Sequence, residues 1–339
     1  MAAMGPLCDA RPRMGPMPPI TGAWHEALVC VRDLDRWIPA LEHLLGWTVQ
    51  LRDDVDPRLL SAWGLPVGAR GREALLVNPA DPPRCVRLMQ LSGVDQIEIR
   101  SSGNHWDTGG IFSLLSYVRD VDATFAAAQQ LGWSAFHDPV DMHFGERVLR
   151  NVVLRGWDGV NFGLYRVLQP LQSDAVYPKA AMSFNAQQSV RDIEPARRFW
   201  RDLLGWHAWF DGVTHLACNN FGMPENYVGR MPKNVIISAG SKNVDGSWAH
   251  GQVELVQWVG FTGQDFAARA VPPNLGILAI RVPVPDADST ARELVERGGH
   301  LFMPPTSVTL APHGEVRLCS VRSPDGAMIE FISLRQDKT

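Results

Sequence analysis

The sequence has little cysteine, and what it has is scattered. Its 339 residues contain five cysteines, at positions 8, 30, 85, 218 and 319. The number is odd and no two of them form a C-x-x-C pair, so neither a disulfide framework nor a structural zinc site is indicated. This usage predicts a protein of the reducing cytoplasm.

Long apolar runs and clustered positive charge are also missing. No stretch approaches the roughly 18 consecutive apolar residues of a membrane span, so a membrane is not an expected partner. The formal net charge is −4 and the Lys and Arg residues form no basic stripe, which argues against nucleic acid as a partner. Residues 1–23 are rich in Met, Pro and Gly, lack the apolar core of a signal peptide, and are expected to form a flexible tail.

The most informative feature that is present is an internal duplication. Three pairs of segments match in the same order: 31–47 with 190–206, 86–93 with 253–260, and 157–159 with 324–326. A repeat of this length indicates a duplicated domain. We therefore predict an N-terminal domain over 24–168, a linker over 169–179 and a C-terminal domain over 180–335.

A weaker repeat lies inside each half, where 118–133 resembles 31–47 and 284–299 resembles 190–206. Each of the four units begins with a short apolar strand, turns at Asp into a helix of 3.6 periodicity, stops at Gly and continues into strands. The units are thus predicted to be β-α-β-β-β. Helix capping explains both the initial Asp and the final Gly of each helix without a catalytic role.

This pattern has a family resemblance. A strand, x-V-x-D, a helix ending in L-G-W and a closing D-G-x-x-x-E strand resemble the vicinal oxygen chelate superfamily, which includes glyoxalase I, extradiol dioxygenases and bleomycin-resistance proteins. The resemblance covers residues 24–335. It implies an α+β fold in which four βαβββ units form two tandem half-open eight-stranded barrels, one in each half, as in the two-domain extradiol dioxygenases.

The resemblance also implies where metal ligands would stand. In the second half, the family positions are Asn185, Ile277 or Ala279, Glu254 and Glu330. In the first half, they are Glu26, Arg87, Ser113 and Gly163. None is a histidine, although iron and catalytic zinc sites usually include imidazole. We therefore expect no metal ligands and no cofactor. Binding of a hard cation through the glutamate oxygens is the alternative that remains.

Histidines outside the family positions offer two other routes to a metal. A one-residue slip of the first strand would turn His25 into the barrel in place of Glu26, but it would also break the spacing to Asp33. Loop histidines are the other source: His143, His215, His250 and His313. A rim position without a metal is the simpler interpretation of each.

The second half carries the richer set of polar residues. Asn185 and Gln187 should point to one side of their strand because alternate residues share a face. Glu254 and Glu330 each interrupt an apolar strand and are expected to converge on the same cavity, where two carboxyls cannot easily both ionise. We predict that they transfer protons and that Asn185 and Gln187 bind the substrate by orienting or polarising its oxygen. Tyr227 and Trp258 are expected to contact the substrate as well.

The first half looks degenerate, since Gly163 replaces the closing Glu. Arg87 replaces the carboxylate of the matching strand and is expected to form an ion pair with Glu26, a pair that is more often structural than catalytic. Core packing is the expected role of four tryptophans at strand or helix ends: Trp24, Trp47, Trp133 and Trp206.

These observations favour a metal-independent or atypically metallated lyase or isomerase. Its expected partner is a hydrophobic carbonyl or aromatic small molecule, and a homodimer is possible. A non-catalytic protein that sequesters such a molecule is the first alternative. An extradiol-type ring-cleaving dioxygenase with ligands outside the family positions is the second.

Overall fold

The computed structural model describes residues 22–78, 80, 84–144, 146–169, 177–215, 227, 232–243, 245–247 and 249–334. The expected tail, 1–23, and linker, 169–179, lie mostly outside the described residues. Within this part of the chain, no helix is both long and apolar enough to cross a membrane.

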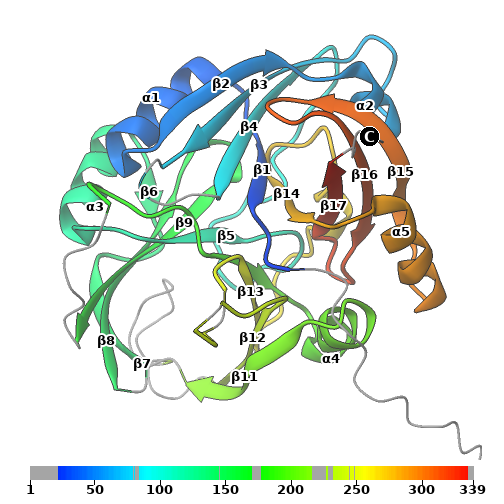
Figure 1. The fold of residues 1–339 in the computed structure, drawn as a ribbon. Helices are drawn as coiled ribbons and strands as arrows, with labels where there is room; N and C mark the ends of the chain where they lie inside the picture. The colour runs from blue at the N-terminus through cyan, green and yellow to red at the C-terminus, as the bar shows by residue number, and fades with distance from the viewer. Residues whose placement is uncertain are drawn as a thin grey trace, which may run out of the picture.

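Four βαβββ units follow one another along the chain, as the repeats predict (Figure 1). The first contains β1 (Glu26–Cys30), α1 (Leu34–Leu45), β2 (Thr48–Asp54), the short α2 (Pro57–Ala62), β3 (Arg70–Val77) and β4 (Cys85–Ser92). The second contains β5 (Ser113–Tyr117), α3 (Val121–Gln130), β6 (Ser134–Ala135), β7 (Val140–Phe144), β8 (Arg147–Arg155) and β9 (Asn161–Gln169).

The second half repeats this order. Its first unit contains β10 (Asn185–Ser189), α4 (Ile193–Arg197), a π-helical turn (Arg198–Leu203), β11 (His207–His215), β12 (Pro232–Ala239) and β13 (Gln252–Trp258). Its second contains β14 (Gly276–Pro283), α5 (Ala287–Glu296), β15 (Leu301–Leu310), β16 (Gly314–Arg322) and β17 (Met328–Leu334).

The helix boundaries confirm the capping interpretation of the repeated Asp and Gly. In all four units an Asp side chain accepts a hydrogen bond from a backbone N–H of the first helical turn: Asp33, Asp120, Asp192 and Asp286. The glycines after the helices have left-handed φ angles, for example 70° at Gly46 and 72° at Gly205. The repeated Asp and Gly therefore begin and end the helices, and capping accounts for their presence without a catalytic role.

The units pair across the two halves of the chain, which corrects one expectation. Sheet A has the strand order β15-β16-β17-β14-β1-β4-β3-β2, and sheet B has β11-β12-β13-β10-β5-β9-β8-β6 with β7 added to β8. The first unit thus shares a sheet with the fourth, and the second with the third. The prediction that 24–168 and 180–335 each close a barrel of their own was wrong, because similar units offer similar strand edges and the repeat does not say which two will pair.

The D-G motifs hold the two units of each half together. Asp158 accepts hydrogen bonds from the backbone N–H of Arg32 (2.9 Å) and from Trp37 Nε1 (2.8 Å). Asp325, in the second half, accepts from the backbone N–H of Arg191 (3.0 Å). Each half is therefore one sequence repeat joined at its D-G turn, while the sheets link the two halves.

The helices and the convex sides of both sheets share one hydrophobic core. The four tryptophans expected to pack the core, Trp24, Trp47, Trp133 and Trp206, are all buried in it. Helices α1 and α3 lie side by side, with the rings of Trp37 and Trp133 5.3 Å apart (Figure 1). Each sheet therefore turns its concave side away from this core.

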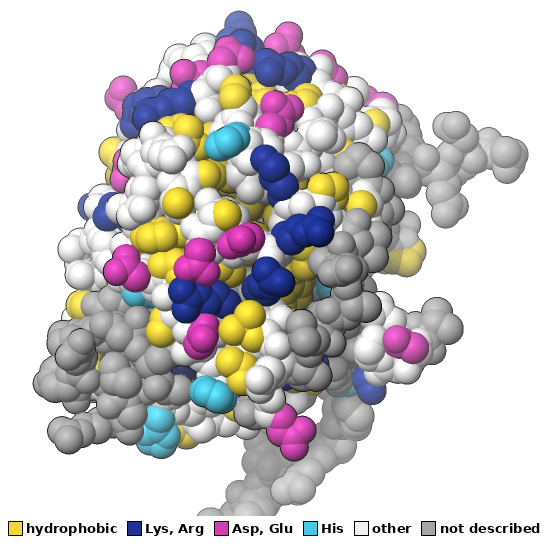
Figure 2. Space-filling view, turned by 90° about the vertical axis from the view of Figure 1, so that its left-hand side faces the viewer, with side chains coloured by type: hydrophobic (Ala, Val, Ile, Leu, Met, Phe, Trp, Pro, Cys, Tyr) yellow, Lys and Arg dark blue, Asp and Glu magenta, His cyan; other side chains and the backbone are white. Residues whose placement is uncertain are grey.

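The face of the molecule shown in Figure 2 mixes charges of both signs. Figure 2 shows Lys and Arg side chains interspersed with Asp and Glu side chains, and small apolar areas between them. This face therefore carries no extended field of one sign that would steer a charged ligand.

Candidate functional site

Strand alternation divides the residues of the central strands between the shared core and the two concave sides, which we call face A and face B. On β1, Ala27 and Val29 join the shared core, whereas Leu28 belongs to a second cluster on the concave side of sheet A. On β10, Ala186 joins the shared core, so Gln187 points to the concave side of sheet B. Each face collects family positions from both halves of the chain.

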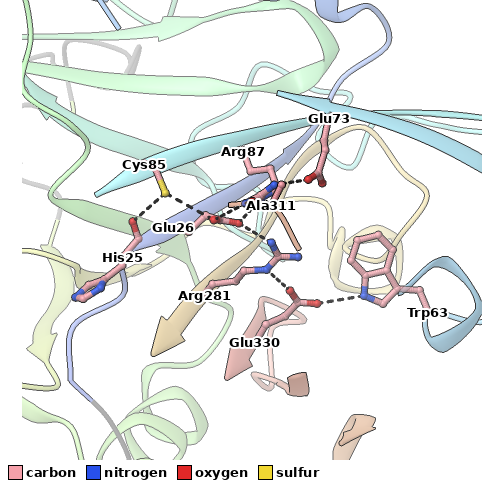
Figure 3. A network of polar contacts seen from close by, with 9 residues as sticks. All are labelled: His25, Glu26, Trp63, Glu73, Cys85, Arg87, Arg281, Ala311 and Glu330. Atoms are coloured by element: carbon pink, nitrogen blue, oxygen red, sulfur yellow. Dashed lines mark hydrogen bonds and ion pairs between the residues drawn. The ribbon is translucent and has the colours of Figure 1, made fainter. Parts of the chain in front are cut away.

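A network of charged side chains crosses the middle of face A (Figure 3). Acids and bases alternate along it in the order Glu73, Arg87, Glu26, Arg281, Glu330, and Trp63 ends it. Arg87 Nε donates to Glu26 Oε1 (2.8 Å), and Arg281 Nη1 donates to the same oxygen (2.5 Å). Arg281 Nε donates to Glu330 Oε2 (2.6 Å). The ion pair predicted between Glu26 and Arg87 is thus confirmed as part of a larger network.

The network is buried, and its two arginines stand between its three carboxyl groups. Glu26 is 6% exposed, and Arg87, Arg281 and Glu330 are 1% exposed or less. Burial alone would raise the pKa of Glu26, but the charges of Arg87 and Arg281 and their hydrogen bonds lower it to about 2. Burial raises the pKa of Glu73 despite the same two arginines. Glu26 is therefore firmly ionised and a poor proton acceptor.

Two segments close face A over this network. Trp63, which follows α2, donates its indole N–H to Glu330 Oε1 (3.1 Å). Arg87 Nη2 donates to the carbonyl of Ala311 in the turn between β15 and β16 (2.7 Å). Leu59 and Leu60 of α2 fill the space beside Trp63 as part of the apolar cluster of this face. Face A is thus a packed interior whose charges serve the fold.

Two expectations about individual residues change here. Glu330 lies on face A, whereas Glu254 lies on β13 in the other sheet, so the two carboxyls do not converge. The reason is the cross-pairing of the units, which puts the closing strand of the second half beside β1. The strand has not slipped at His25 either: Glu26 faces the network, and Figure 3 shows the His25 ring pointing away from it.

Face B carries a row of polar side chains across three neighbouring strands. Gln187 on β10 stands opposite Glu254 on β13 and Ser113 on β5. Gln187 Nε2 donates to Glu254 Oε1 (3.3 Å), and Ser113 Oγ donates to Gln187 Oε1 (3.1 Å). Asn185, two residues earlier on the same side of β10, is 2% exposed, and its Oδ1 accepts no hydrogen bond from the described residues. This oxygen is therefore a buried acceptor without a donor among the described residues.

Glu254 differs from the carboxylates of face A because no arginine among the described residues pairs with it. It forms no ion pair within the described part of the chain and remains half-buried. Burial raises its pKa, while the charge of Lys233 on β12 and the Gln187 hydrogen bond oppose this rise. A carboxyl that is desolvated yet partly accessible can take up a proton more readily than an ion-paired one.

Aromatic side chains border this row of polar groups. Tyr117 stacks on Phe184 with ring centroids 4.5 Å apart and planes 11° from parallel. Trp258 belongs to the hydrophobic cluster of face B, and Tyr227 packs against it, with its ring 5.0 Å from that of Phe261. Of the six residues predicted for the site, the structure places five on or beside face B, and Glu330 elsewhere.

Sequence reasoning missed Lys233 and did not foresee the place of Ser113 beside Gln187. Ser113 was a family position of the first half, and only the antiparallel pairing of β5 with β10 brings it to Gln187. Lys233 stands opposite Trp258, so the alternation of β12 against β13 could have indicated it once their register was known.

Comparison with known proteins gives the fold a name. No protein-family model and no curated protein matches the sequence. Glyoxalase I from Zea mays matches in structure with a TM-score of 0.61 and 16% identity over 92% of both chains. A putative dioxygenase from Bacillus subtilis matches with a TM-score of 0.53 and 11% identity over 94% of this chain and 87% of that chain. The chain has the vicinal oxygen chelate fold. The resemblance found in the sequence is thereby confirmed for the fold, and fold alone does not define activity.

The metal that this fold implies does not fit the residues present. On face A, the guanidinium groups of Arg87 and Arg281 stand among the carboxylates and would repel a divalent cation. On face B, the position that holds a carboxylate in the family is Gly163, and a Cβ there would lie 2.4 Å from Leu115 Cδ2, so a larger residue would require Leu115 to move. Among the described residues, no three His, Cys, Asp or Glu side chains come together in a way that would hold a metal ion.

Proposed function

We propose that face B is the functional site and that the protein is a lyase or isomerase acting on a hydrophobic carbonyl or aromatic small molecule. One observation carries this proposal: Glu254 is a desolvated, partly accessible carboxyl that forms no ion pair with any described residue, and it lies among aromatic side chains. A carboxylate with a raised pKa is suited to remove a proton from a carbon next to a carbonyl group and to return it.

The other groups of face B would act on the substrate in distinct ways. Glu254 takes the proton from carbon, and the positive charge of Lys233 stabilises the negative charge that develops on the substrate oxygen. Asn185 Oδ1 accepts a hydrogen bond from a hydroxyl or N–H group of the substrate. Trp258 and Tyr227 contact its apolar part. Glu330 has no place in this mechanism, because its carboxylate is bonded to Arg281 and Trp63.

Sequestration without catalysis is the second candidate. The stacked rings of Tyr117 and Phe184 favour it, because a flat aromatic surface beside polar groups binds a planar molecule without any need for a base. A ring-cleaving dioxygenase, the third interpretation from the sequence, has no specific observation in its favour among the described residues.

The experiment uses 2-hydroxyacetophenone, an aromatic ketone with an acidic C–H bond, as a probe. Proton NMR in D₂O follows the exchange of this hydrogen with and without protein. We expect the protein to accelerate exchange and Glu254→Gln to reduce the acceleration by about 10²–10⁴, the usual contribution of a general base. Glu296→Gln, which changes an exposed carboxylate on α5, is the matched control and should leave the rate unchanged.

The same samples separate the two candidates. Saturable binding of the probe, seen as quenching of tryptophan fluorescence, together with exchange at the buffer rate, would support sequestration. Accelerated exchange that survives in Glu254→Gln would exclude Glu254 as the base.

A further inference from the structure

We propose that Ser113 and Gln187 are positioning residues for Glu254: the Ser113 hydroxyl fixes the Gln187 amide, and the amide fixes one carboxyl oxygen. The proposal deepens the function proposed above, since it assigns the groups that aim its base. It concerns a residue, Ser113, that makes no contact with the carboxyl it controls.

Two hydrogen bonds connect Ser113 to Glu254 through Gln187. Ser113 and Gln187 are 0% and 1% exposed, so neither can exchange its partner for solvent. Ser113 Oγ donates to Gln187 Oε1, and the NH₂ group at the other end of the amide points toward β13, where it donates to Glu254 Oε1. Glu254 Oε2 makes no hydrogen bond within the described part of the chain, which leaves this oxygen for the substrate proton.

Removal of the Ser113 hydroxyl therefore has an effect at a distance. A buried amide oxygen without a donor is costly, and the Gln187 amide loses the contact that holds it in its present orientation. Any population in which the amide turns its oxygen toward Glu254 opposes the ionised carboxylate, because two acceptors then face each other. The proton affinity of Glu254 should rise even though Ser113 does not touch it.

The test measures this proton affinity directly. Protein labelled with ¹³C at the glutamate carboxyl carbon is titrated by NMR, and the Glu254 signal is assigned as the one missing from Glu254→Gln. We expect about three- to tenfold tighter proton binding by Glu254 in Ser113→Ala, the size of one net hydrogen bond. Ser113→Thr, which retains the hydroxyl, should restore the wild-type value.

The same strand provides a matched control. Ser116, on the opposite side of β5, is also 0% exposed, and its hydroxyl pairs with that of Ser183 (3.0 Å). Ser116→Ala removes an equally buried hydroxyl, so it should affect stability but leave the titration of Glu254 unchanged.

Three results would overturn the proposal: a Ser113→Ala titration within twofold of wild type, an equal shift in Ser116→Ala, or no restoration in Ser113→Thr. If Ser113→Ala does not fold, Gln187→Met is titrated instead. Unchanged proton binding by Glu254 in Gln187→Met would also overturn the proposal. The readout requires no turnover. If the protein is inactive toward every probe, the proposed function is refuted. The titration of Glu254 still tests the positioning roles of Ser113 and Gln187.

Discussion

The two concave faces of this molecule are built from the same kind of unit, yet they treat a buried carboxylate in opposite ways. At equivalent positions, face A carries Arg87 and Glu330 where face B carries Glu254 and Gly163. On face A, arginine charges lower the pKa of Glu26 to about 2. On face B, burial raises the pKa of Glu254. One fold thus supplies a carboxylate locked in its ionised form and another prepared to change its protonation state.

The difference between Glu26 and Glu254 follows from the partners of each carboxylate rather than from its burial. Glu26 is more deeply buried than Glu254, so desolvation alone would make it the better base. Two guanidinium groups reverse that order, because charge-assisted hydrogen bonds favour the ionised form. The carboxylates of face A therefore stabilise the fold. Of the two faces, face B is the one whose carboxyl group is suited to proton transfer.

The largest expected effect comes from removing one charge from face A. Arg281→Met leaves Glu26 and Glu330 buried with fewer partners, and we expect a loss of about 3–5 kcal/mol in the free energy of unfolding, as for other broken buried ion pairs. Urea denaturation at pH 7 measures it. Arg317→Met, which removes a half-exposed ion pair with Asp288, should lose about 1 kcal/mol or less. If both variants lose the same free energy of unfolding, the network on face A stabilises the protein no more than a surface ion pair does.

Acid should reveal the same network with a somewhat smaller effect. The pKa of Glu26 is lowered from 4.5 to about 2 on folding, so its contribution to stability is present above pH 4.5 and is lost as the pH falls through 2. At 1.36 kcal/mol per tenfold change in proton affinity, this contribution is about 3 kcal/mol. Unfolding of wild type and Glu26→Gln between pH 6 and pH 2 measures it. The two curves should converge toward low pH, and a constant separation would contradict the assignment.

Local sequence patterns predicted the units of this fold but not their arrangement. Asp caps, helix-ending glycines and alternating strands depend on neighbours in the chain, and these agree with the structure in all four units. The pairing of β1 with β14 joins residues about 250 positions apart, and no local pattern encodes it. Sheets built from similar units can exchange partners without changing any local preference.

The same limit explains what was found and missed in the site. Period-two alternation placed Asn185 and Gln187 on one side of a strand, and the repeat identified Glu254 beside them. Glu330 was assigned to the same cavity because the closing strand was expected to return to its own half. Lys233 carries no motif, and its position near Glu254 depends on the register of β12 against β13.

The closure of face A can be tested at its last hydrogen bond. Trp63→Phe keeps most of the apolar volume but removes the N–H donor of Glu330, and we expect a loss of about 1.5–3 kcal/mol, the range for hydrogen bonds to charged groups. Trp209→Phe removes a similar bond to the neutral Gln252 at the edge of sheet B and should lose about 1 kcal/mol or less. Thermal and urea unfolding compare the two. A larger loss at Trp209 would mean that Trp63 does not seal a charged interior.

The smallest expected effect has the opposite sign and belongs to face B. The pKa of Glu254 is raised on folding, so its contribution to stability is fully present below the ordinary glutamate pKa and is lost as the pH rises through the folded value. Glu254→Gln retains an oxygen for the Gln187 N–H and never becomes charged, so it escapes this loss. Relative to wild type, the variant should therefore be more stable at pH 8 than at pH 4, by less than any of the other effects predicted above. Urea denaturation at the two pH values measures it. A variant that is instead less stable at pH 8 would show that Lys233 neutralises Glu254 as fully as the arginines neutralise Glu26, and the contrast between the two faces would disappear.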